Sequence, residues 1–135
     1  MEYQEFLQRI QSFTELTRAG RLKESEDALY QLILSDISDL DKSGICANLA
    51  DVYDRMGKTE EALAWFDKGI ALEQVYCRFE VTEKKAEFLS QLGHSKDAIG
   101  IYESLLKEPF LRESEKVRVR KAIQNQLGRT LHDWK

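Results

Sequence analysis

Apolar residues recur every three or four positions along most of this chain, which is the spacing of one face of a helix. The clearest stretch, residues 44–73, predicts two short amphipathic helices joined at residues 56–59. Its apolar positions are Ile45, Cys46, Leu49, Ala50, Val52, Tyr53 and Met56 in the first helix, and Ala62, Leu63, Trp65, Phe66 and Ile70 in the second. Such a hairpin cannot bury its apolar stripe alone. The stretch therefore predicts neighbouring helices that cover it.

The joint between the two helices carries the residues of a helix end and a helix start. Gly57 stands where the first helix needs a residue in the left-handed region, which glycine adopts without strain. Thr59 is expected to cap the second helix, and Glu60 and Glu61 place negative charge at its positive end. We therefore expect a tight helical hairpin.

The same periodicity extends over the rest of the chain. It predicts helices at residues 2–19, 24–36, 41–56, 60–73, 75–92, 95–108 and 113–131. Pro109 disfavours helix at Glu108 and separates the last two. The last helix is expected to bury a stripe with spacing four, and Gly128 to shorten it; the stripe is Val119, Ile123, Leu127 and Leu131. No linker rich in Pro, Gly or Ser divides the chain, so we expect one domain over residues 1–135.

The helix ends repeat at a fixed distance. Gly20, Gly57 and Gly93 are separated by 37 and 36 residues. Small residues follow in the next helices at Ala28, Ala62 and Ala98, separated by 34 and 36 residues, so the first turn is expected to be about three residues longer. A small side chain lets the two helices of a hairpin approach closely. Self-similarity at this period is typical of stacked helical hairpins.

The middle repeat resembles a tetratricopeptide (TPR) repeat, whose pattern is W-x2-L-G-x2-Y, then A-x3-F, then P. It reads Cys46-x2-Leu49-Ala50-x2-Tyr53 and then Ala62-x3-Phe66, with Cys for Trp, Ala for Gly and no Pro. The third repeat reads Thr82-x2-Lys85-Ala86-x2-Leu89, Ala98-x3-Tyr102 and Pro109. The resemblance covers residues 3–110 and implies an all-α solenoid of three TPR-like hairpins, at about 3–37, 43–76 and 79–112, plus a C-terminal capping helix at about 113–131. Another α-solenoid or a plain helical bundle is the alternative.

Charge is uneven along the chain. The net charge of −4 divides into −8 over residues 1–111 (13 Lys+Arg, 21 Asp+Glu) and +4 over residues 112–135 (7 against 3). The basic residues at this end include Arg118, Arg120, Lys121 and Arg129. A nucleic-acid patch is one interpretation, but the patch is short and the protein is acidic, which favours a solvated face.

Candidate chemistry is sparse. The sequence has no glycine-rich phosphate loop and no cysteine or histidine pair at metal-ligand spacing, and neither His94 nor His132 is arranged with a nucleophile. We therefore predict no catalytic residue, no metal and no cofactor. Cys46 and Cys77 are expected to be reduced thiols that pack as small hydrophobic residues.

Aromatic residues fall mostly on the packing stripes, so we expect a core that contains Tyr53, Trp65, Phe66, Phe88 and Tyr102. Trp134 is expected either to dock on the last helix, which we favour, or to contact a partner. The chain shows no secretory signal and no apolar run of transmembrane length, so we expect a cytoplasmic protein that does not bind membranes.

The resemblance implies that the first helices of the hairpins line a concave groove. The expected partner-binding residues are Asn48, Asp51, Asp54, Arg55, Glu83, Lys84 and Glu87. Only Asn48 and Lys84 match the carboxylate clamp by which some TPR domains hold chaperone tails, so we do not predict that ligand. The acidic residues indicate either a solvated face or a site for a basic or amphipathic basic segment.

The sequence thus predicts a non-catalytic protein–protein interaction module, such as an adaptor, that binds a peptide or helix of a partner. Alternatives are a self-associating scaffold subunit, in which another copy fills the groove or covers an end of the array, or a secretion-type chaperone. A special case of self-association places the basic helix, residues 112–135, on the acidic residues of a neighbouring molecule.

Overall fold

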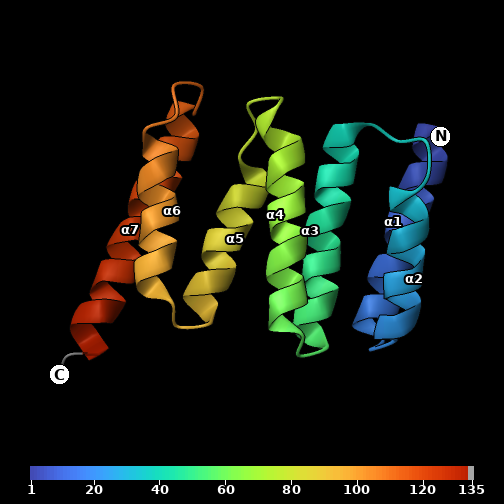
Figure 1. Ribbon diagram of the computed structural model, residues 1–135, viewed down its shortest axis with the longest axis horizontal. Helices are drawn as coiled ribbons and strands as arrows, with labels where there is room; N and C mark the ends of the chain where they lie inside the picture. Colours follow the sequence, from blue (N-terminus) through green and yellow to red (C-terminus); the bar gives the residue numbers. More distant parts are fainter. Residues whose placement is uncertain (134–135) are drawn as a thin grey trace. The chain divides into compact units, whose positions relative to one another are not determined.

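The structure, a computed structural model, describes the backbone of residues 1–133 and the side chains of residues 1–128. Within this part the chain forms seven α-helices and no strand (Figure 1). They are α1 (Tyr3–Arg18), α2 (Leu22–Ile33), α3 (Asp39–Arg55), α4 (Thr59–Gln74), α5 (Glu80–Gln91), α6 (Ser95–Leu106) and α7 (Glu113–Asp133). The predicted all-α class is confirmed. None of the helices in the described part is long and apolar enough to cross a membrane.

The chain divides into two compact units, Met1–Tyr76 and Cys77–Lys135. In the first unit α1 packs on α2, α2 on α3 and α3 on α4. In the second unit α5 packs on α6 and α6 on α7. Successive helices within each unit run in opposite directions (Figure 1). Each unit is therefore built from helical hairpins. That residues 1–135 form a single domain stays a prediction.

The turns of the three hairpins share one backbone geometry. Gly20, Gly57 and Gly93 have φ of +77°, +77° and +84°. The residue after each glycine donates its N–H to the carbonyl five positions earlier, over 2.9 Å: Arg21 to Leu16, Lys58 to Tyr53 and His94 to Leu89. This hydrogen bond closes the end of the first helix and requires the left-handed residue. The predicted role of these glycines is confirmed.

This shared geometry corrects the expectation for the first hairpin. Ser25, Ala62 and Ala98 each lie five residues after their glycine and are fully buried, at 0% exposure, whereas Ala28 is only half-buried. The small residue of the first hairpin is therefore Ser25. Its hydroxyl lies 2.7 Å from the Thr17 hydroxyl, which satisfies it inside the hairpin. The first turn is no longer than the others, and α2 begins at Leu22 rather than near Glu24.

Two further helix starts differ from prediction. The fifth helix was expected from Val75, but α4 continues to Gln74 and α5 begins only at Glu80. Cys77 between them has φ of +55°, which interrupts the helix in a run whose apolar spacing alone looks continuous. Thr59 does not cap α4: the N-cap residue is Lys58, and it makes no side-chain capping hydrogen bond.

Most of the predicted core residues are buried. Tyr53, Phe66, Phe88 and Tyr102 are buried, while Trp65 is half-buried and meets Tyr30 edge to face at 5.5 Å. The predicted position of Trp134 lies outside the described residues. Cys46 is buried and free, as expected.

Cys77 corrects another expectation, because this free thiol is exposed rather than packed as a small hydrophobic residue.

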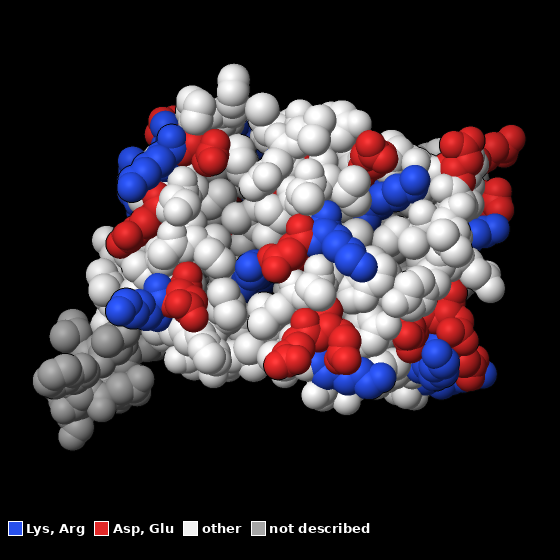
Figure 2. Space-filling view, in the orientation of Figure 1, with Lys and Arg blue, Asp and Glu red and all other residues white. Residues whose placement is uncertain are grey.

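The surface carries both signs of charge close together. Lys and Arg lie beside Asp and Glu in most of the charged clusters on the face shown in Figure 2. Pairs within one helix, such as Arg9 with Glu5 at 3.0 Å, are typical of this arrangement. Such exposed pairs contribute little to stability.

Candidate functional site

Four of the predicted partner-binding residues lie on α3 in the first unit. Asp51 and Arg55 are exposed, and Asn48 and Asp54 are half-buried. Arg55 Nε lies 3.0 Å from Asp51 Oδ2, one helical turn away. Arg55 thus offsets the charge of Asp51, while Asp54 makes no ion pair with a described residue.

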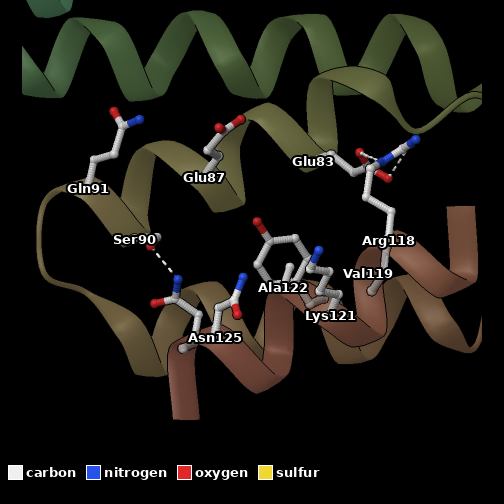
Figure 3. Close-up of a pocket in the computed structure, with 11 residues that line it drawn as sticks. Glu83, Glu87, Ser90, Gln91, Arg118, Val119, Lys121, Ala122 and Asn125 are labelled. Carbon is white, nitrogen blue, oxygen red and sulfur yellow. Dashed lines mark hydrogen bonds and ion pairs between the residues drawn. The ribbon is translucent and has the colours of Figure 1, made fainter. Parts of the chain in front are cut away.

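The other three lie on α5 in the second unit. Glu83 and Glu87 line a pocket of about 350 Å³, whereas Lys84 is exposed and does not line it (Figure 3). The remaining walls come from Tyr102 of α6 and from residues 118–126 of α7. The structure therefore brings Glu83 and Glu87 together with the basic helix that follows them in the same unit.

One end of this pocket is closed by an ion pair. Arg118 donates from Nε to Glu83 Oε2 at 3.0 Å and from Nη2 to Glu83 Oε1 at 2.9 Å (Figure 3). This two-bond geometry is a strong form of arginine–carboxylate contact. Hydrogen bonding to Glu83 raises the pKa of Arg118. Arg118 is exposed, as a solvated face predicts, and it also pairs with a carboxylate of α5.

The charge distribution along the chain gave one indication of this ion pair, because residues 1–111 are acidic and residues 112–135 are basic. It could not identify the partners, because Glu83 and Arg118 are 35 residues apart and meet only through the packing of three helices.

The floor of the pocket is polar. Tyr102 is 7% exposed, and its hydroxyl makes no hydrogen bond with any described residue. Burial, followed by the charges of Glu87 and Glu83, raises the pKa of Tyr102, so its hydroxyl stays protonated at neutral pH. At the other end, the Gln126 amide donates a hydrogen bond to the Ser90 hydroxyl (Figure 3).

Three side chains at the rim complete the pocket. Glu87, Lys121 and Asn125 are exposed, and within the described part of the chain their side chains form neither ion pairs nor hydrogen bonds. They remain available to a ligand.

A second pocket of about 250 Å³ lies where the loop before α5 meets the start of α7. Its buried carboxylate, Glu115, accepts hydrogen bonds from Arg112 N at 3.2 Å and from Arg112 Nε at 2.8 Å. The Arg112 side-chain bond is the largest cause that lowers the pKa of Glu115. These bonds fix the first turn of α7. No group of three or more His, Cys, Asp or Glu in the described part of the chain could hold a metal ion.

The inner face of α7 differs from the predicted stripe. Val119 is buried as expected, but Leu127 is 49% exposed, and the neighbouring Gln126 is buried at 5% exposure. Gln126 turns inward because Ser90 offers it a hydrogen-bond partner. Gly128 does not shorten the helix, which continues to Asp133. Leu131 lies among the residues whose side chains are not described.

Residues 43–76 match the tetratricopeptide repeat family. No curated protein and no solved structure matched this chain. The match covers α3 and α4 and confirms the resemblance predicted for the middle repeat. Repeats of this family generally mediate protein–protein interactions.

Proposed function

Because residues 43–76 form a tetratricopeptide repeat, we propose that this protein is a non-catalytic module that binds a peptide or helix of a partner protein. The repeat itself is the observation that carries the proposal. The hairpins at residues 3–37 and 79–112 share its turn geometry, so we include them as divergent repeats, with residues 113–131 capping the last one. The two free cysteines support a reducing, cytoplasmic compartment.

Partner contacts are assigned to the first helices of the hairpins. In the first unit these are Asn48, Asp51, Asp54 and Arg55 of α3, and in the second unit they are Glu83, Lys84 and Glu87 of α5. The first unit carries 8 Lys+Arg against 15 Asp+Glu, a net charge of −7. Charge of one sign speeds the encounter with a ligand of the opposite sign. A basic or amphipathic basic segment therefore fits best.

A protein ligand is favoured over nucleic acid. Arg118, one of the four basic residues that the sequence made candidates for a nucleic-acid patch, is engaged by Glu83, which leaves the patch smaller. A patch of cations free to bind phosphates is what nucleic-acid binding requires.

The test captures partners from the native cell with the whole chain as bait. One variant carries Asp51→Lys and Glu87→Lys on the first helices. A control carries the same change in charge on the second helices, at the exposed Glu60 and Glu103. We expect the first variant to lose partners that the control retains, and wild-type capture to weaken as salt rises. Identical partner sets from both variants would contradict the proposal.

Self-association is the second candidate, and the charges of the units favour it. The second unit carries 12 Lys+Arg against 9 Asp+Glu, a net charge of +3, opposite to the −7 of the first. Sedimentation velocity at micromolar concentration distinguishes the candidates. A stable dimer that dissociates as salt rises supports self-association, and a monomer at low salt excludes it.

A further inference from the structure

The pocket formed by α5, α6 and α7 carries the features of a site for a cationic side chain. We propose that it receives an arginine or lysine side chain of a partner segment, held between the Glu87 carboxylate and the Tyr102 hydroxyl. This inference rests on the proposed function and specifies what one of its sites recognises.

The α5 wall already holds one cation. The Arg118 guanidinium sits on Glu83 through two hydrogen bonds of 3.0 and 2.9 Å. Glu87 lies four residues further along the same helix and therefore on the same face. Its carboxylate lines the pocket and, among the described residues, makes no ion pair or hydrogen bond. Glu87 thus lies one helical turn from Glu83 on the same face, but no arginine or lysine among the described residues pairs with it.

The floor of the pocket offers a second acceptor. Tyr102 is more than nine-tenths buried and lines the pocket, yet its hydroxyl has no hydrogen-bond partner within the described residues. The hydroxyl reaches the open space of the pocket, so a ligand that enters can form a hydrogen bond with it. The phenolic oxygen can accept a hydrogen bond from a guanidinium or ammonium N–H.

The sign of the ligand follows from the field at this floor. The Glu83 and Glu87 carboxylates line the pocket together with Tyr102, and after burial their charges raise the pKa of Tyr102. The Arg118 charge is matched by Glu83, and the exposed Lys121 can extend its ammonium into water on a flexible stem. The floor therefore favours a cation over an anion.

The size of the pocket limits the ligand. A volume of about 350 Å³ lies at the lower end of the range of about 300–1,000 Å³ for ligand pockets. This is room for one long side chain. Asn125 at the rim can then hydrogen-bond with the peptide groups on either side of it.

The test uses the isotope-labelled full chain and three small amides followed by NMR. N-acetyl-arginine N-methylamide is the probe, and the citrulline analogue has the same shape without the charge. The aspartate analogue asks whether Lys121 selects an anion instead. We expect saturable shifts from the arginine probe in residues 83–91, in Tyr102 and in residues 118–126. The citrulline analogue should bind at least about threefold more weakly, and the aspartate analogue should not saturate.

Variants identify the two acceptors. Glu87→Gln and Tyr102→Phe are each expected to weaken the arginine probe at least about threefold. Glu103→Gln, an exposed position on α6 that does not line the pocket, is the matched control and should bind like the wild type. Equal binding of arginine and citrulline, unchanged affinity in Glu87→Gln, a preference for the aspartate probe, or no saturation would each overturn the inference.

The capture experiment reports on the proposed function separately. If the arginine probe fails while the charge-reversed variant still loses partners, this pocket assignment falls and the proposed function stands. If the probe binds as expected while both capture variants keep the same partners, the cation site stands and the proposed function falls.

Discussion

The two compact units each bury a tyrosine, but they treat its hydroxyl differently. In the first unit the Tyr53 hydroxyl donates to Glu26 Oε1 at 2.8 Å and lies 2.9 Å from the Tyr30 hydroxyl, so α2 and α3 share a closed network. In the second unit the Tyr102 hydroxyl has no such partner among the described residues and lines a pocket. A satisfied buried group specifies how two helices pack, whereas an unsatisfied one is available to a ligand.

Ion pairs differ between the units in the same way. On α3, Asp51 pairs with Arg55 of its own helix, which ties no other element to it. On α5, Glu83 pairs with Arg118 of α7 and joins two helices of the second unit. The first helix of a hairpin can thus pair its acidic residues within itself, as α3 does, or use them to hold a neighbouring helix, as α5 does.

The largest expected effect is a loss of stability at a feature that both units share, the small buried residue between the two helices of a hairpin. Ala62→Leu in the first unit and Ala98→Leu in the second should each lower the free energy of unfolding by about 1–3 kcal/mol, because both sites are fully buried and overpacking forces the helices apart. Urea unfolding measures this, and Ala64→Leu on the exposed face of α4 is the control. Two variants as stable as the parent would show that the hairpin packing is wrong.

The second prediction tests the contrast between the tyrosines. Tyr53→Phe should cost about 1–3 kcal/mol of unfolding free energy, because it removes a donor from the buried Glu26 carboxylate. Tyr102→Phe should leave stability within about 0.5 kcal/mol of the wild type, because its hydroxyl makes no internal hydrogen bond. Urea unfolding compares the two, and equal losses would remove the contrast.

The third prediction concerns acid stability of the second unit. The folded-state pKa of Glu115 lies below its ordinary value of 4.5. As pH falls, Glu115 is therefore protonated in the unfolded chain at a higher pH than in the folded protein. The stabilisation is therefore present above pH 4.5 and is lost as pH falls toward the lower folded-state pKa. Glu115→Gln should be less stable than the wild type at pH 7, and the difference should shrink toward pH 3. Thermal melts across this range measure it, and a constant difference would contradict the assignment.

The smallest expected effect is the coupling energy of each of the two ion pairs, Asp51 with Arg55 and Glu83 with Arg118. Double-mutant cycles should give a coupling below about 1 kcal/mol for each, because both arginines are more than half exposed. The coupling of Glu83 with Arg118 should exceed that of Asp51 with Arg55, since it has two hydrogen bonds and a more buried carboxylate. The reverse order would show that α7 is not held by this pair.

Local features of the chain were readable from the sequence by itself. The three hairpin turns follow from Gly20, Gly57 and Gly93, because a positive φ strains most other residues. Most of each helix follows from the apolar spacing, although the spacing missed the break at Cys77 before α5. The middle repeat follows from residues that match the family. These features depend on neighbours in sequence, so the sequence is sufficient to predict them. The partner-binding residues on α3 and α5 stay predictions.

Only the tertiary structure decided which side chains meet. Ser25 rather than Ala28 fills the first hairpin because its hydroxyl forms a hydrogen bond with the Thr17 hydroxyl. Gln126 rather than Leu127 turns inward because its amide donates a hydrogen bond from α7 to the Ser90 hydroxyl on α5. The pairing of Glu83 with Arg118 and the open hydroxyl of Tyr102 likewise depend on how α5, α6 and α7 pack. A polar residue is buried where a partner satisfies it, and that partner can lie some 36 residues away.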